Sequence, residues 1–204
     1  MSLYQRTVLP YLIHASMRVE TFAAYRRRVV PLAEGRVLEI GIGSGLNLPF
    51  YSERATQVIG LDPSPNLLSM AGKAMNGMRR RVELLEGSAE RIPLEDKSVN
   101  TVVTTWTLCS ILDVMLALRE LRRVLKADGR LLLIEHGYSP DPHVRRWQDR
   151  LTPAWKRIAG GCHLNRPIKH IIEDSGFRFE RLGTGYMRGP KAMTFMYEGS
   201  ARGV

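Results

Sequence analysis

Short hydrophobic runs alternate with segments of helical periodicity through the first two thirds of the chain. Five runs have the length and composition of buried strands, and they cover residues 37–40, 57–61, 82–85, 101–104 and 131–134. The last of these runs is entirely apolar, as expected for a central parallel strand that is covered on both faces. Strands separated by helices indicate βαβ units. The pattern therefore predicts an α/β fold with a central, mostly parallel sheet and helices on both faces.

Local signals mark where several helices begin and end. Ser64 suits an N-cap with Pro65 at the first helical position, and Asp113 suits the N-cap of a helix that stops at Gly129. The first thirty residues also read as helix, with arginines between apolar positions and Pro31 at the end. This amphipathic segment fits either a lid packed on the domain or a segment lying on a membrane surface, and we favour the lid.

The last third of the chain carries a different pattern. Apolar residues from Val144 to Ile158 follow helical spacing that is interrupted at Thr152-Pro153, and a short helix runs from Pro167 to Ser175. Two final runs, residues 177–182 and 192–197, suit a terminal antiparallel pair of strands. We predict one domain in three parts, which are an N-terminal helical lid (1–32), a ligand-binding core (33–136) and a substrate-side region of helices and antiparallel strands (137–204).

Composition places the chain among soluble globular proteins. It has 204 residues, of which 44% are hydrophobic and 25% charged. We find no apolar run of the roughly 18–20 residues that span a membrane and no signal-peptide pattern, so we expect a cytoplasmic location. The two cysteines, Cys109 and Cys162, are too few for a disulfide framework or a zinc cluster, and we expect no metal.

The formal net charge of +10 is the unusual bulk property. Basic residues cluster at 26–28, 79–81, 122–123 and 145–146. Dispersed clusters of this kind are most often solvated helix faces and turn ends, while peripheral contact with an anionic membrane stays open as an alternative. We do not expect nucleic acid as a partner, because the chain has no zinc-finger spacing, RNA-binding strand motif or glycine-arginine repeat.

A glycine-rich turn directly after the first strand is the strongest functional signal. It reads Glu39-Ile40-Gly41-Ile42-Gly43-Ser44-Gly45. Glycines there let the backbone approach a ligand and aim amide groups of the following segment at it. A dinucleotide fingerprint would need a glycine at position 46, which is leucine, and the acidic Glu39 would repel a pyrophosphate. Glu39 suits a cation, and S-adenosylmethionine (SAM) carries a sulfonium and an ammonium group.

Two further elements follow at the ends of the next strands. Asp62 ends the second strand, where a carboxylate can accept hydrogen bonds from both hydroxyls of an adenosine ribose. Gly87-Ser88-Ala89-Glu90 follows the third strand, where an adenine edge would lie. A glycine turn alone is a common structural feature, but this ordered set favours SAM binding.

At this point the chain resembles the class I SAM-dependent methyltransferases, in particular methyltransferases of type 11, over roughly residues 35–136. The resemblance lies in residues 37–45, in Leu61-Asp62-Pro63-Ser64, in residues 87–94 and in residues 118–129. Ser88 departs from the aspartate that usually accepts a hydrogen bond from the adenine amino group. The resemblance implies a Rossmann-like fold with an antiparallel C-terminal strand, SAM as cofactor and S-adenosylhomocysteine as product. The cofactor-binding residues that we predict are Glu39, Gly41, Gly43, Gly45, Asn47, Asp62, Pro63, Ser88, Ala89, Glu90 and Thr105.

The tail is similar to the methyltransferase-like proteins that methylate alkyl thiols. The similarity lies in residues 105–110, in Trp147, in residues 153–162 and in Leu164-Asn165-Arg166. It implies a small or lipophilic methyl acceptor, which could be a thiol. A phospholipid amine such as phosphatidylethanolamine and the carbon of a ubiquinone or menaquinone precursor stay open as acceptors. A SAM-binding regulator without turnover is the alternative outside enzymology.

A thiol, amine or enolate acceptor must lose a proton before it attacks the methyl group. His136 and Tyr138, just after the fifth strand, and His163 in the tail are the candidates for a base. Each has a structural alternative, since His136 could brace the strand end and His163 could cap a turn. We expect Cys109, Cys162, Trp147 and Trp155 to be core residues.

Overall fold

The computed structural model describes residues 4, 7–78 and 80–204. Its helices are α2 (Leu9–Met17), α3 (Glu20–Val29), α4 (Pro65–Ala74), α5 (Val114–Val124), α6 (Pro142–Ile158), α7 (Ile168–Asp174) and α8 (Lys191–Thr194), with short 3-10 helices η1 (Val30–Leu32) and η2 (Leu48–Phe50). Its strands are β1 (Gly35–Ile40), β2 (Ala55–Asp62), β3 (Arg81–Glu86), β4 (Val99–Thr105), β5 (Leu125–His136), β6 (Phe177–Tyr186) and β7 (Phe195–Gly203).

The strands form one seven-stranded sheet in the order β3-β2-β1-β4-β5-β7-β6. Neighbouring strands from β3 to β5 pair in parallel, and β7 pairs antiparallel with both β5 and β6. This arrangement confirms the predicted parallel sheet with an antiparallel C-terminal strand. The strand order reverses between β1 and β4, and in open α/β sheets ligands bind at the carboxyl ends of the strands at such a point.

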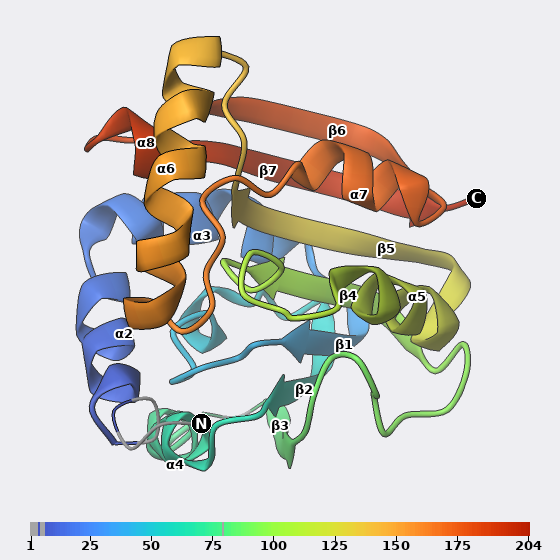
Figure 1. Cartoon of the computed structure of the whole chain (residues 1–204). Helices are drawn as coiled ribbons and strands as arrows, with labels where there is room; N and C mark the ends of the chain where they lie inside the picture. The colour runs from blue at the N-terminus through green and yellow to red at the C-terminus, as the bar shows by residue number, and fades with distance from the viewer. Residues whose placement is uncertain (1–3, 5–6, 79) are drawn as a thin grey trace.

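Hydrophobic side chains cover both faces of the sheet. Residues 131–134 of β5 are fully buried, and Leu131 and Leu133 join the cluster that contains Leu118 of α5. Leu132 joins the opposite cluster, which includes Val29 of α3. Figure 1 shows α5 and α7 on the face of the sheet toward the viewer and α3 behind it. The apolar run predicted as a central strand is therefore covered on both sides, as its composition requires.

Local helix signals are confirmed at two N-caps. The side chain of Ser64 accepts a hydrogen bond from the Leu67 amide at the start of α4, and that of Asp113 accepts one from the Leu116 amide at the start of α5. The helix capped by Asp113 was predicted to stop at Gly129. This prediction is wrong, because α5 ends at Val124 and the chain passes directly into β5. The amide of Ser98 donates to the Val124 carbonyl over 2.8 Å, so the start of β4 ends this helix.

The N-terminal segment forms two helices, because Val19 between α2 and α3 has an extended backbone with ψ of 150°. The break predicted at Thr152-Pro153 is wrong, since α6 continues through Pro153. The Thr152 hydroxyl lies in the same turn and donates to the Gln148 carbonyl over 2.6 Å. A proline costs a helix one backbone hydrogen bond, and α6 tolerates that loss.

The two tryptophans of α6 differ in exposure. Trp147 on α6 is 57% exposed, so its prediction as a core residue is wrong, whereas Trp155 is partly buried. None of the helices in the described part of the chain combines the length and the apolar character needed to cross a membrane.

Candidate active site

The glycine turn lies at the end of β1, next to the loop that follows β4. Gly41, Gly43 and Gly45 have φ of 64°, 56° and 78°, a region that favours glycine. A Cβ on Gly41 would lie 2.2 Å from the Thr107 hydroxyl oxygen, whereas the nearest described atom to one on Gly43 would be the Gly41 carbonyl oxygen, at 3.9 Å. Gly41 is therefore required both by its backbone conformation and by close packing against the β4 loop.

Glu39 lies beneath this turn and is 1% exposed. One carboxylate oxygen accepts a hydrogen bond from the side-chain amide of Asn47 over 2.8 Å, and the other accepts one from the Tyr51 hydroxyl over 2.7 Å. Burial raises the pKa of Glu39 to about 7, although these hydrogen bonds and the charge of Arg26 oppose the rise. Neither Tyr51 nor Arg26 was among the predicted site residues, because no local pattern links them to the glycine turn.

Asn47 joins three elements at the base of the site. Besides Glu39, its amide group donates to the Thr105 hydroxyl at the end of β4 over 2.9 Å. Its carbonyl oxygen accepts from Nε of Arg26, also over 2.9 Å. Two predicted cofactor residues, Asn47 and Thr105, are thus brought into direct contact by the fold. Arg26 is 4% exposed, and burial lowers its pKa to about 10.

Asp62 connects the end of β2 to the glycine turn. One carboxylate oxygen accepts from the Gly43 amide over 3.0 Å and the other from the Ser64 amide over 2.8 Å. Burial raises the pKa of Asp62. Each oxygen has a second lone pair, so the carboxylate can accept further hydrogen bonds such as those from a ribose. Pro63 is exposed directly beside it.

The loop after β3 is held by its own side chains. The Ser88 hydroxyl donates to the Glu90 carboxylate over 2.8 Å, and the other oxygen of that carboxylate accepts from the Asp113 amide over 2.7 Å. Ala89, which lies between Ser88 and Glu90 in the sequence, is buried. Glu90 therefore ties the predicted adenine loop to the start of α5, and its contact with adenine stays a prediction.

The N-terminal helices contact the site at two places. His14 of α2 lies within hydrogen-bond distance of the Ser44 hydroxyl in the glycine turn, with 2.7 Å between Nδ1 and Oγ. Phe22 and Tyr25 of α3 meet the Trp106 ring edge to face, with ring centroids 5.0 and 6.3 Å apart. The guanidinium of Arg26 lies 5.2 Å from the centre of the same ring.

Trp106 has an unusual backbone for its residue type. Its φ is 51°, in the left-handed region that bulky residues rarely adopt, and its buried indole N–H has no hydrogen-bond partner among the described residues. Strained backbones of this kind cluster at ligand-binding and catalytic sites. Trp106 follows Thr105 directly, at the β4 end of the site, and packs against the same hydrophobic cluster as Ile42 of the glycine turn.

The three candidate bases separate into two groups. The two histidines each contact one of the cysteines. Nε2 of His136 is 3.2 Å from Sγ of Cys162. Nδ1 of His163 is 3.2 Å from the carbonyl oxygen of Cys109. Tyr138 points to α6, where its hydroxyl donates to Asp149 over 2.5 Å. The structure thus brings the two histidines together and leaves Tyr138 apart, and the role of each as a base stays a prediction.

The arginines of the first basic cluster, residues 26–28, have partners within the chain. Arg26 is buried as described, Arg27 forms an ion pair with Glu20 and Arg28 one with Glu198 over 2.9 Å. The first triplet is therefore only partly a solvated cationic face. Residue 79 of the second cluster lies outside the described residues.

Comparison with known proteins agrees with this geometry. A family model for a methyltransferase domain matches residues 38–133. The chain is 36% identical to the thiol S-methyltransferase TMT1B of Rattus norvegicus over 71% of its own length and 60% of that protein. It is 30% identical to the human thiol S-methyltransferase TMT1A over 80% of its own length and 68% of that protein. A demethylmenaquinone methyltransferase of Clavibacter sepedonicus is 31% identical over 62% of this chain and 51% of its own length.

A solved structure has the same fold. It is that of a SAM-dependent methyltransferase of Thermotoga maritima, described as a possible histamine N-methyltransferase, with a TM-score of 0.71 and 22% identity over 98% of both chains. The present chain spans about three fifths of the length of the TMT1B proteins that it matches. The sheet order, the glycine turn with Glu39 and Asp62, and these matches agree, and the chain belongs to the class I SAM-dependent methyltransferases.

Proposed function

We propose that this chain transfers the methyl group of SAM to the sulfur of a small or lipophilic thiol. Similarity to two thiol S-methyltransferases supports the choice of acceptor, because it extends beyond the cofactor-binding core to 80% of the chain in the human TMT1A match. The acceptor would lie where the loops after β4 and β5 meet the segment between α6 and α7.

A buried positive charge at this place is the structural observation that carries the proposal. Arg166 is 9% exposed, and its guanidinium donates to the carbonyl oxygens of Leu108 and Ile111 over 2.5 and 2.8 Å. The guanidinium also lies 3.2 Å from Nδ1 of His163, and it interacts electrostatically with the buried Glu135 without a direct ion pair. All three hydrogen-bond partners lack a formal negative charge when the histidine is neutral, and no ion pair to Arg166 occurs among the described residues.

A cation without a direct counterion favours an anion nearby, so a thiol bound there would release its proton to solvent and attack as the thiolate. The thiolate sulfur would form a bond to the methyl carbon while the bond from that carbon to the sulfonium sulfur breaks. The sulfonium sulfur keeps the electron pair, and S-adenosylhomocysteine leaves as a neutral thioether. Because the leaving group needs no protonation, much of the rate enhancement would come from positioning the two reactants.

Release of S-adenosylhomocysteine tests the proposal. Purified chain is incubated with SAM and, in separate reactions, an alkyl thiol, phosphatidylethanolamine in vesicles and a demethylated quinone. We expect product with the thiol, and the Arg166→Met variant should lose most of this turnover while it still binds SAM in calorimetry. Turnover with either other acceptor and none with a series of thiols would overturn the thiol assignment.

Two other outcomes have distinct readouts. C-methylation of the quinone would fit the similarity to the Clavibacter enzyme, which covers less of this chain. Binding of SAM without product from any acceptor would favour a SAM-binding regulator.

A further inference from the structure

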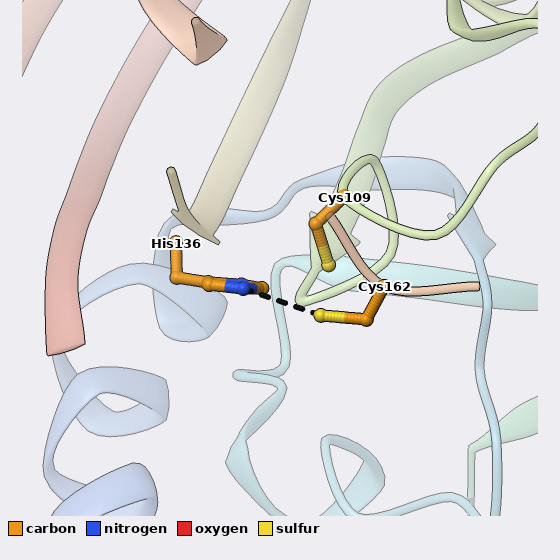
Figure 2. A group of neighbouring side chains, drawn as sticks. All are labelled: Cys109, His136 and Cys162. Carbon is orange, nitrogen blue, oxygen red and sulfur yellow. Dashed lines mark hydrogen bonds between the residues drawn. The ribbon is translucent and has the colours of Figure 1, made fainter. Parts of the chain in front are cut away.

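Three ligand-type side chains converge close to the predicted acceptor site. Cys109 in the loop after β4, His136 at the end of β5 and Cys162 between α6 and α7 each offer one atom, and these atoms all lie within 4.8 Å of one another. Nε2 of His136 and Sγ of Cys162 lie 3.2 Å apart. Figure 2 shows the three side chains directed toward a common centre from three separate segments.

The backbone holds each of these residues in place. The Cys109 carbonyl oxygen accepts a hydrogen bond from the His163 amide over 2.8 Å, which ties the β4 loop to the Cys162 segment. His136 is the last residue of β5 and pairs with Met196 of β7. Cys162 follows Gly160 and Gly161, whose φ values of 62° and 88° form the turn that reverses the chain after α6. Well-anchored ligands on separate elements are what a preorganised metal site needs.

From this arrangement we propose that Cys109, His136 and Cys162 form a binding site for Zn²⁺. Two thiolates and an imidazole nitrogen are ligands that zinc prefers, whereas Mg²⁺ and Ca²⁺ prefer oxygen. Tetrahedral zinc with its usual bond lengths separates such ligand atoms by about 3.5–3.8 Å. The group therefore needs only side-chain adjustments to close around the ion. From the two cysteines alone we expected no metal; the proposed site adds His136, at the end of β5, as a third ligand.

Neighbouring side chains suit the coordinated state. The indole N–H of Trp155 donates to Sγ of Cys162 over 3.2 Å, as donors around zinc thiolates commonly do. Zn²⁺ with two thiolates has no net charge, which lowers the cost of burial at Cys109, a residue only 1% exposed. Three protein ligands leave the fourth tetrahedral position to a water molecule or an added ligand such as a thiol, as in catalytic zinc sites.

Metal binding is tested on the full chain, independently of methyl transfer. Metal-free protein is titrated with Zn²⁺ in competition with a coloured chelator, and Co²⁺ is added in parallel to record the thiolate-to-cobalt absorption. We expect one ion per chain. Cys162→Ser and His136→Asn should weaken Zn²⁺ binding by more than the roughly 10–100-fold that loss of an outer partner costs, and Trp155→Phe should fall within that range.

His163→Asn is the matched control, because this histidine contacts the same segment but is not in the group. It should bind Zn²⁺ like the original chain. SAM binding by calorimetry verifies the fold of each variant, and Cys162→Ser provides the test if the more buried Cys109→Ser fails to fold. Equal Zn²⁺ affinity in the original chain and in His136→Asn would overturn the site. So would a Cys109–Cys162 disulfide that persists in mild reductant in place of metal binding.

Discussion

Nε of Arg26 in α3 donates a hydrogen bond to Oδ1 of Asn47, 2.9 Å away, in the segment after the glycine turn. Asn47 in turn donates to Glu39 at the end of β1. Arg26 also donates from Nη1 to the Met17 carbonyl oxygen over 2.9 Å. A single buried guanidinium therefore connects the N-terminal helices to the base of the cofactor site.

Replacing Arg26 by alanine should lower the free energy of unfolding by about 1–3 kcal/mol, because the buried Asn47 side chain and the partly buried Met17 carbonyl lose their donor. Urea denaturation measures this change. Arg27→Ala is the control, since that side chain is 52% exposed and pairs with Glu20, and it should change stability by no more than about 0.5 kcal/mol. Equal losses in the two variants would show that the Asn47 contact contributes nothing.

Gly41 and Gly43 make a second matched pair. Alanine at either position would have to adopt a left-handed φ, which would lower the free energy of unfolding by roughly 1–2 kcal/mol. Only Gly41→Ala also places a Cβ against Thr107, and overpacking of this kind costs about 1–3 kcal/mol more. We expect Gly41→Ala to be the less stable variant in thermal unfolding. The reverse order would mean that the two loops are not in close contact.

Asp62 should contribute directly to SAM affinity. Hydrogen bonds to a charged group contribute about 1.5–3 kcal/mol, so Asp62→Ala should weaken SAM binding at least roughly tenfold in calorimetry. Asp96→Ala is the control, because the Asp96 side chain is 72% exposed and pairs with Arg123. Undiminished affinity in Asp62→Ala would remove this carboxylate from the cofactor site.

Glu39 should make the stability of the chain without SAM depend on pH. Burial raises its pKa to about 7 from an ordinary value of 4.5, Asp62 adds to the rise, and Tyr51, Asn47 and Arg26 oppose it. The folded chain then holds this proton more tightly than the unfolded chain. The stability contributed by Glu39 is therefore full below about pH 4.5 and is lost as the pH rises through about 7.

The Glu39→Gln variant isolates this effect, because glutamine does not titrate. The free energy of unfolding of the original chain, measured relative to Glu39→Gln, should fall between about pH 5 and about pH 8. Urea denaturation at a series of pH values provides the comparison. A difference that stays constant over this range would contradict the raised pKa.

Several features could be predicted from the sequence because their causes are local. Residues 131–134 are apolar at every position, and only a strand covered on both faces buries them all. Ser64 and Asp113 cap helices with their own side chains within three residues. The glycines at positions 41, 43 and 45 indicate a turn with left-handed φ values by their residue type alone.

Other local predictions failed in the structure. Gly129 does not end a helix, because the hydrogen bond from Ser98 to Val124 starts the strand earlier. The proline at position 153 does not interrupt α6. Trp147 is exposed although its spacing and residue type suit a core. At Gly129 a contact with a distant segment outweighed a weak local preference.

By itself, then, the sequence determined the sheet of βαβ units, the glycine turn and the two carboxylates at its strand ends, since residue type and periodicity act over a few neighbours. Only the tertiary structure decided that Arg26 supports Asn47, and that Cys109 and Cys162 meet His136. Those contacts join residues far apart in the chain. Their geometry depends on how strands and loops pack at one end of the sheet, which no local pattern records.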